Sequence, residues 1–287
     1  RIIRNGEVRI NKGRTSADAR VQPGDVVRIP PVRITSKPEE VDRAIPGREF
    51  PVLLEDDVVL AINKPAGVAV HGGSGVSFGV IEQLRQARPQ ARFLELVHRL
   101  DRDTSGILLL AKKRSALTNL QDQFRERETG KTYLALVQGH WAANRKVIDT
   151  PLHKYLLPDG ERRVKVVAKD HPDAMHSVSL VKVRQRLPAQ PAQGLPELSL
   201  LEVTIKTGRT HQIRVHMASS GHPIAGDDKY GDFELNKVLQ KQVLKRMFLH
   251  AWRLQFNHPL TGERHELLCP LPPELARLVP DDVRPKP

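Results

Sequence analysis

Apolar residues recur along this chain with two different periods, which together predict a mixture of strands and helices. Alternating or continuous apolar runs, typical of strands, occupy VVLAINK, Ile107–Ala111, KTYLALV and LSLLEVTI. A spacing of three or four residues, typical of one helix face, relates Phe78, Ile81 and Leu84, and then Leu117, Leu120 and Phe124. We expect Thr129–Gly130 to end the second helix. Because strands and helices do not alternate regularly, the pattern favours an α+β fold over a doubly wound parallel sheet.

Turn signals and composition divide the chain into a short basic module, a linker and one large domain. Residues 1–31 alternate apolar and charged positions around two turn signals, Asn5–Gly6 and Pro23–Gly24, which predicts a small β-ribbon. Such a ribbon is too small to fold alone. Residues 32–48 are rich in proline and charge and lack periodicity, which indicates a linker. Residues 49–287 carry the remaining strand and helix patterns and form the main domain.

The charge balance indicates a polyanionic partner. The chain has 46 Lys and Arg against 33 Asp and Glu, a net charge of +13. A surplus of this size makes nucleic acid the first candidate, and a surface charged only for solubility is the alternative. Cys269 is the single cysteine, which excludes an internal disulfide and a thiolate zinc cluster and fits a cytoplasmic protein. No apolar run or signal-peptide pattern predicts a membrane span.

Several common chemistries do not fit the motifs. HGGSG at residues 71–75 lacks the Gly-Lys-Ser/Thr of a phosphate-binding loop and fails the G-x-S-x-G frame. His211 and His216 are poorly spaced for a metal, and no G-x-G-x-x-G dinucleotide fingerprint occurs. We therefore expect no metal and no cofactor. What remains is carboxylate chemistry on an anionic substrate, either glycosidic bond cleavage or chemistry on a nucleobase.

The stretch HRLDRDTSG, residues 98–106, concentrates charge between the apolar runs LV and ILLLA. It contains two carboxylates, Asp101 and Asp103. The pattern alone allows either a solvated charged turn between two buried elements or a site where one carboxylate does chemistry.

HRLDRDTSG resembles the signature of the RluA-type pseudouridine synthases, and four further segments resemble motifs of that family in the same order. These are NKPAG with VAVHGG (63–73), GKTYLALVQG (130–139), KTGRTHQIRVHMASSGHPIAGDDKYG (206–231) and FLHAWRLQFNHPLTGE (248–263). The resemblance extends over about residues 49–270. It implies a mixed, mostly antiparallel central sheet with flanking helices. It also implies isomerisation of uridine in RNA, in which ribose C1′ exchanges its bond to N1 of uracil for a bond to C5.

The first 30 residues resemble the later part of an S4 RNA-binding domain. Such a module would contact the RNA backbone through basic side chains that include Arg4, Arg9, Lys12 and Arg14, and its binding would weaken with added salt. Within the family, GVIEQLRQARPQARFLELVHRLDRDTSG and PLHKYLLPDGERR resemble most closely the bacterial enzymes that modify 23S ribosomal RNA. The implied partner is 23S rRNA or its large-subunit precursor, and we expect a monomer.

The resemblance also implies catalytic roles by motif position. Asp101 becomes the nucleophilic or charge-stabilising carboxylate, whereas Asp103 has a local turn role with Thr104. Burial would neutralise Asp101 without a cation, and the resemblance supplies Arg214; a purely structural ion pair is the alternative. Tyr133 would stack on or beside the target base and remove the C5 proton, although a strand tyrosine is ordinarily core packing.

Further residues are expected to contact RNA. Arg99 would fill the space that a flipped uridine vacates and stack on adjacent bases, and a phosphate contact is its alternative. Ile213 would form an apolar floor under uracil. Lys206, Arg209 and His211 are assigned to phosphates. For His98 and Arg102, phosphate and structural contacts both stay open.

Two rival functions share parts of this pattern. One is an RNA-binding ribosome assembly factor without activity, and the intact trio Asp101, Tyr133 and Arg214 argues against it. The other is an RNA or nucleoside glycosidase, which would require a second carboxylic acid across the bond. The sequence offers no clear candidate for that acid.

Overall fold

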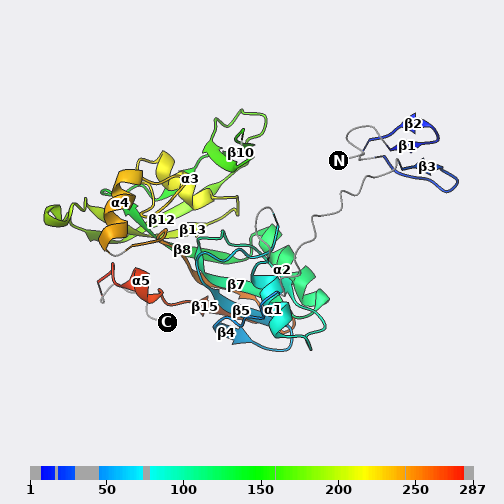
Figure 1. The fold of residues 1–287 in the computed structure, drawn as a ribbon, viewed down its shortest axis with the longest axis horizontal. Coiled ribbons are helices and arrows are strands. Elements are labelled where there is room, and N and C mark those ends of the chain that lie inside the picture. Colours follow the sequence, from blue (N-terminus) through cyan, green and yellow to red (C-terminus); the bar gives the residue numbers. More distant parts are fainter. Residues whose placement is uncertain are drawn as a thin grey trace. The chain divides into compact units, whose positions relative to one another are not determined.

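The chain divides into two units, residues 1–44 and 45–287. The computed structural model describes residues 8–16, 19–29, 45–73, 78–158, 160–242 and 244–280. Figure 1 shows the elements of both units in sequence colours. None of the helices among the described residues has the length and apolar character that crossing a bilayer requires.

The first unit contains a small antiparallel sheet in the order β2-β1-β3. Its strands are β1 (Arg9–Ile10), β2 (Gly13–Arg14) and β3 (Val27–Arg28). Arg9 stands opposite Arg14 on one side and Arg28 on the other, so three arginines form one row across the sheet. This confirms the predicted ribbon strands. The Asn5–Gly6 turn and Arg4 lie outside the described residues.

The second unit is built on a ten-stranded sheet with the path β4-β5-β7-β14-β8-β13-β12-β9; β6 pairs with β7 and β15 with β14. Its strands are β4 (Val52–Glu55), β5 (Val59–Lys64), β6 (Glu95–Leu96), β7 (Ser105–Ala111), β8 (Gly130–Gln138), β9 (Val147–Asp149), β12 (Val178–Leu187), β13 (Leu198–Ile205), β14 (Leu249–Asn257) and β15 (Arg264–Leu268). All pairings are antiparallel except that of β7 with β14. The expected α+β fold with a mostly antiparallel sheet is confirmed.

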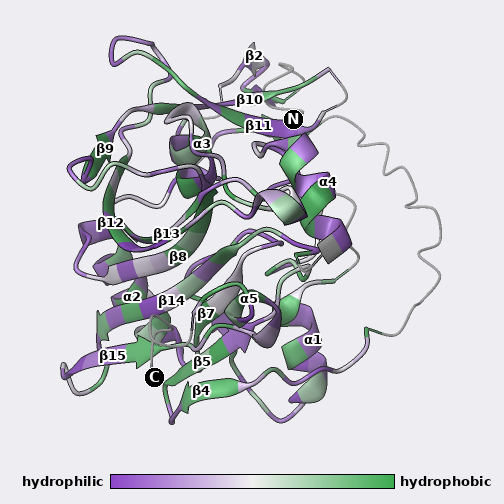
Figure 2. Cartoon of the chain, turned by 90° about the vertical axis from the view of Figure 1, so that its left-hand side faces the viewer, coloured by the Kyte–Doolittle hydropathy of each residue, from purple (hydrophilic) through white to green (hydrophobic). Residues whose placement is uncertain are grey.

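Helices and one separate hairpin complete this unit. The helices are α1 (Val80–Ala87), α2 (Arg114–Glu126), α3 (Gln212–Ser219), α4 (Phe233–Gln242) and α5 (Pro273–Ala276), with a short 3₁₀ turn at Pro191–Gln193. The hairpin pairs β10 (Leu152–Leu156) with β11 (Arg162–Val166). Purple and green alternate along α1 in Figure 2, as expected for a helix with one face on the core.

The central strands are buried on both faces because α1 and α2 cover opposite sides of them. Leu108 and Leu110 of β7 join the cluster that contains α1, whereas Leu109 and Ala111 join the cluster that contains α2. All seven residues of β7 are buried. The prediction of a strand covered on both faces at Ile107–Ala111 is confirmed.

The predicted end of α2 was wrong. The helix ends at Glu126, and Arg127 adopts the left-handed conformation with φ 65°. Its N–H bonds to the Gln123 carbonyl and caps the last turn. Gly130 already belongs to β8, so the Thr129–Gly130 pair starts the strand rather than stopping the helix.

One glycine is required where β7 meets β14. Gly106 has φ 111° and pairs with Ala251, and a Cβ at Gly106 would lie 2.2 Å from the Ala251 carbonyl oxygen. No L side chain fits so close to backbone. This contact fixes the start of β7, directly after the charged stretch.

We expect Gly106→Ala to destabilise the second unit by about 3 kcal/mol or more, since it combines a steric clash with a strained backbone. Gly262→Ala is the matched control: φ is 73° and nothing lies within 4 Å of its Cβ position, so it should cost about 1 kcal/mol. Urea unfolding followed by tryptophan fluorescence measures both, because Trp141 and Trp252 are the only tryptophans and both lie in this unit. Equal midpoints for the two variants would contradict the argument.

Candidate active site

The charged stretch HRLDRDTSG forms the turn between β6 and the start of β7, and a buried lysine fixes this turn. Lys64, at the end of β5, is fully buried and its Nζ donates to the carbonyls of Pro65, Val68 and Arg102 at 2.8, 2.9 and 3.0 Å. Burial and the nearby charge of Arg246 lower the pKa of Lys64 to about 7. The Lys64 side chain therefore ties the NKPAG segment to the turn that carries Asp101.

The far end of this turn is fixed by a second buried network. The Ser105 hydroxyl accepts a hydrogen bond from Arg246 Nη2 and lies 2.8 Å from His250 Nδ1, and His250 Nε2 lies 3.0 Å from the Cys269 carbonyl. Burial lowers the pKa of His250 to about 4, so the ring is neutral in this network. Asp101 thus projects from a turn that is anchored on both sides.

Arg214 of α3 brings a fixed positive charge to Asp101. Its side chain is 2% exposed, and it donates to Asp227 through Nε and Nη2 at 2.7 and 2.6 Å. Nη2 also reaches Asp228 at 3.1 Å, while Nη1 lies 3.9 Å from Asp101 Oδ2. Burial opposes ionisation, but the hydrogen bonds and charge of Asp227 raise the pKa of Arg214 above its usual range. Arg214 therefore makes a structural ion pair and also faces Asp101.

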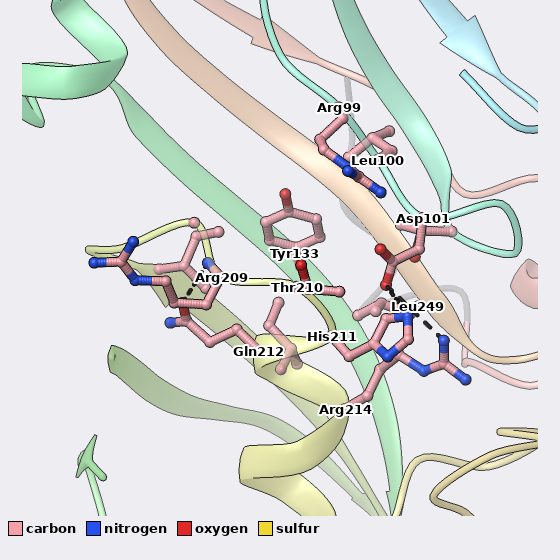
Figure 3. A pocket seen from close by; sticks show the side chains of 14 residues that line it. Arg99, Leu100, Asp101, Tyr133, Arg209, Thr210, His211, Gln212, Arg214 and Leu249 are labelled. Carbon is pink, nitrogen blue, oxygen red and sulfur yellow. Dashed lines mark hydrogen bonds and ion pairs between the residues drawn. The ribbon is translucent and has the colours of Figure 1, made fainter. Parts of the chain in front are cut away.

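Tyr133 faces the same space from β8. Its ring packs against two of the core clusters, and Figure 3 shows it across the pocket from Asp101, whose carboxylate points toward His211 and Arg214. Burial, and secondarily the negative charge of Asp101, raise the pKa of Tyr133 well above its usual range. The resting side chain is therefore a neutral phenol.

These groups line one cavity of about 100 Å³. Its wall combines the charged groups with apolar side chains, namely Leu100, Ile205, Ile213 and Leu249. A second cavity of about 270 Å³ shares Arg99, Asp101, His211 and Arg214 with the first. A small pocket with an aimed carboxylate, a phenol and apolar walls suits a flat uncharged ring joined to an anionic chain.

The structure brings most of the predicted catalytic-domain residues together. Asp101, Tyr133, Arg214, Arg99, Arg209, His211 and Ile213 line the first cavity, and Arg102 lines the second. Arg99 and Arg209 are exposed at the pocket, whereas the His211 side chain is only 13% exposed. Lys206 is exposed but lines neither cavity.

Two members of the charged stretch have structural contacts. His98 stacks on Phe124 with ring centroids 4.9 Å apart, and its Nε2 accepts the Leu109 N–H at 3.1 Å. Burial lowers the pKa of His98 to about 4, which keeps the ring uncharged. Arg102 forms an ion pair with Asp103 at 3.2 Å. His98 thus supports the turn from inside the fold.

In the first unit, Arg9 and Lys12 line a separate cavity together with Arg28. Arg14 lies in the row of arginines described above. The predicted RNA contacts of this unit therefore have a shared basic surface among the described residues.

Sequence reasoning missed Lys64, Asp227 and Tyr230, although all three lie in motifs that were recognised, NKPAG and GDDKYG. Asp227 is 1% exposed, and Tyr230 contacts His211. The motif letters mark these segments, but they do not say which carboxylate of the Asp227–Asp228 pair is buried.

Among the described residues, one group of side chains could hold a metal ion. His153, His171 and Asp173 bring ligand atoms within 4.8 Å of one another. They come from β10 and the loop after β11, and none of them lines the pocket around Asp101. The pocket itself offers no such group within the described chain.

We expect Asp227→Asn to destabilise the second unit by about 3–5 kcal/mol, because it removes the buried negative charge that pairs with the Arg214 guanidinium. The matched control is Asp228→Asn, whose side chain is 60% exposed and which should cost less than about 1 kcal/mol. Urea unfolding followed by tryptophan fluorescence measures both. A loss for Asp227→Asn as small as that of the control would show that the ion pair contributes little.

Comparisons with known proteins agree with this geometry. Residues 58–219 match the family model described as RNA pseudouridylate synthase. The chain is 48% identical to "Ribosomal large subunit pseudouridine synthase C" of Pasteurella multocida, over 97% of this chain and 83% of the relative, and 49% identical to the protein of that name in Escherichia coli K12, over 96% and 85%.

Solved structures give the same assignment. Human RNA Pseudouridylate Synthase Domain Containing 1 superposes with a TM-score of 0.64 and 28% identity, covering 80% of this chain and 88% of that one. Human RNA Pseudouridylate Synthase Domain Containing 4 gives 0.62 and 27%, covering 79% and 90%. The order of motifs, the fold and these relatives together show that the chain belongs to the RNA pseudouridylate synthase family.

Proposed function

We propose that this enzyme isomerises uridines of 23S ribosomal RNA, or of its large-subunit precursor, with Asp101 as the attacking carboxylate. The observation that carries the proposal is the placement of Asp101 in a small pocket opposite Tyr133, with its Oδ2 3.9 Å from a buried arginine. The names of the two curated relatives support the large-subunit substrate. An assembly factor without activity would not need this pocket.

The chemistry follows from the charges in the pocket. Asp101, which faces the fixed positive charge of Arg214, attacks or stabilises C1′ as the bond to N1 of uracil breaks. The freed ring turns within the pocket. C5 then joins C1′ and displaces the Asp101 carboxylate. The oxygen of Tyr133 takes the proton on C5 while the phenol's own proton passes to solvent.

Tyr133 acts after Asp101 because the proton on C5 can leave only once C5 has joined C1′. In the resting site burial and the charge of Asp101 raise the pKa of Tyr133, so this side chain is a neutral phenol. Its oxygen can therefore take the C5 proton only as its own proton leaves.

Basic residues around the pocket and in the first unit would bind the RNA. Arg99 is exposed at the pocket and would fill the space left by a flipped uridine, while Arg209, Lys206 and Arg102 would contact phosphates. Residues 1–31 would act as an S4-like RNA-binding module, followed by a linker at 32–48 and the catalytic domain at 49–287. The row of Arg9, Arg14 and Arg28 supports that role, since like charges aligned across a sheet are unfavourable without an anion. We propose a cytoplasmic monomer.

We expect Asp101→Asn to reduce pseudouridine formation by at least about a thousandfold, because an amide cannot attack C1′. Its RNA affinity and unfolding midpoint should stay unchanged. Asp103→Asn is the matched control and should keep most of the activity. Chromatography of nucleosides from a 23S rRNA fragment separates pseudouridine from uridine, and abasic ribose in place of pseudouridine would identify a glycosidase. Near-native activity of Asp101→Asn would refute the mechanism.

We expect Arg99→Ala to slow modification of a uridine inside a stem by about tenfold more than that of the same uridine in an unpaired strand, since only the stem requires the stack to be filled. Single-turnover rates on the two matched RNAs measure this difference. If both rates fall equally, Arg99 contacts a phosphate instead.

Mapping pseudouridines in rRNA from cells with and without the protein identifies the natural sites.

A further inference from the structure

A tyrosine outside the catalytic trio connects the β10–β11 hairpin with the pocket. The Tyr230 hydroxyl accepts the N–H of Val164 in β11 at 3.0 Å and lies 2.8 Å from His211 Nδ1. The other ring nitrogen, His211 Nε2, lies 4.0 Å from Asp101 Oδ2. The Val164 N–H, the Tyr230 hydroxyl and the His211 ring thus form a hydrogen-bonded chain that ends 4.0 Å from Asp101.

The direction of these hydrogen bonds determines which nitrogen of His211 carries the proton. The Tyr230 oxygen already accepts from Val164, and Nδ1 of His211 is the one acceptor that its proton reaches among the described residues. Donation from Tyr230 would make Nδ1 an acceptor and would place the proton of the neutral ring on Nε2. Burial lowers the pKa of His211, which favours the neutral ring, although the charge of Asp101 opposes this effect.

The backbone also fixes the ring of His211. His211 precedes α3 with φ 52° and ψ 22°, a left-handed conformation that a histidine adopts at a cost. The next residue is locked: Gln212 Oε1 accepts from the Thr207 hydroxyl and the Arg209 N–H, and its Nε2 donates to the Val178 carbonyl. A strained residue next to a locked one indicates that the position of the side chain matters.

The hairpin is docked on this same segment by several contacts. Leu152 and Val164 pack with Val215 of α3 in one small cluster, which Tyr230 joins. Arg163 donates to the Lys229 carbonyl at 2.6 Å, and its guanidinium lies 5.7 Å from the centroid of the Tyr230 ring. The position of the hairpin and that of Tyr230 are therefore coupled.

The hairpin also exposes cations that RNA can contact. Lys154, Arg162 and Lys165 are exposed on its two strands. Contacts between these cations and phosphates would hold the hairpin in its docked position.

We propose that Tyr230 and His211 are positioning residues that aim Asp101: Tyr230 holds the His211 ring with its N–H on Nε2, and this N–H faces Oδ2 of Asp101 at 4.0 Å. The inference rests on the proposed function and deepens it. Arg214 Nη1 approaches the same oxygen at 3.9 Å. The positive charge of Arg214 and the Nε2–H of His211 both attract Oδ2, so Oδ1 is the oxygen left to attack C1′. RNA bound on the hairpin would then stabilise the orientation of the Asp101 carboxylate without contacting it.

Two substitutions at His211 separate an effect on the orientation of Asp101 from an effect on the stability of the fold. The side-chain amide in His211→Gln would place an N–H near the position of Nε2, whereas the shorter amide in His211→Asn would not reach it. Asparagine tolerates the left-handed backbone better, so His211→Asn should be at least as stable as His211→Gln. We expect the opposite order in activity, with the single-turnover rate of His211→Gln about tenfold above that of His211→Asn. Activity that follows stability instead would overturn the proposal.

Tyr230→Phe tests whether the Tyr230 hydroxyl orients His211 and, through it, Asp101. The single-turnover rate should fall by about tenfold while the dissociation constant for the RNA changes less than about twofold. Nitrogen-15 NMR of the histidine rings in the full chain, with His211 identified by its loss in His211→Asn, should show the Nε2–H form in the native protein and a mixture in Tyr230→Phe. An Nδ1–H ring or an unchanged rate would refute the inference. The NMR result needs no RNA, so it decides the inference even if the native chain makes no pseudouridine, a result that would refute the proposed function alone.

Discussion

The buried pair of Arg214 and Asp227 is the interaction on which the geometry of the pocket depends. Two hydrogen bonds, from Nε and Nη2, fix the plane of the guanidinium and leave Nη1 pointing toward Asp101. Because both partners are almost fully buried, salt and water screen their attraction little. The protein itself therefore fixes a positive charge beside Asp101, as the proposed catalytic role of this carboxylate requires.

The turn that presents Asp101 is just as constrained, and its restraints come from distant parts of the chain. Lys64, in the NKPAG motif, holds the Arg102 carbonyl, while Arg246, in the segment just before β14, holds Ser105. Gly106 brings β7 against β14 at a distance that only a glycine allows. The carboxylate thus stands on a rigid base, so the binding energy of RNA is not spent on ordering it.

The sequence predicted the elements whose signal is local. Ile107–Ala111 is a continuous apolar run and became a strand buried on both faces. The end of α2 was misplaced because Arg127 adopts a left-handed conformation, which residue type does not signal. The motif order gave Asp101, Tyr133 and Arg214 together, but His98 and Arg99 show the limit of such reasoning. These neighbours lie in one motif, yet one is stacked on Phe124 inside the fold and the other is exposed at the pocket.

Among the residues that the structure describes, cations of two kinds occur that composition cannot separate. Arg214 is buried and Arg246 is partly buried, and carboxylates or carbonyl groups hold both, so they set geometry. Arg99, Arg209 and Lys206 are exposed around or near the pocket, where a phosphate or a base can reach them. A net charge of +13 reports only the sum. Burial explains the difference between these cations. A charge removed from water must have a protein partner, whereas an exposed charge remains accessible to RNA.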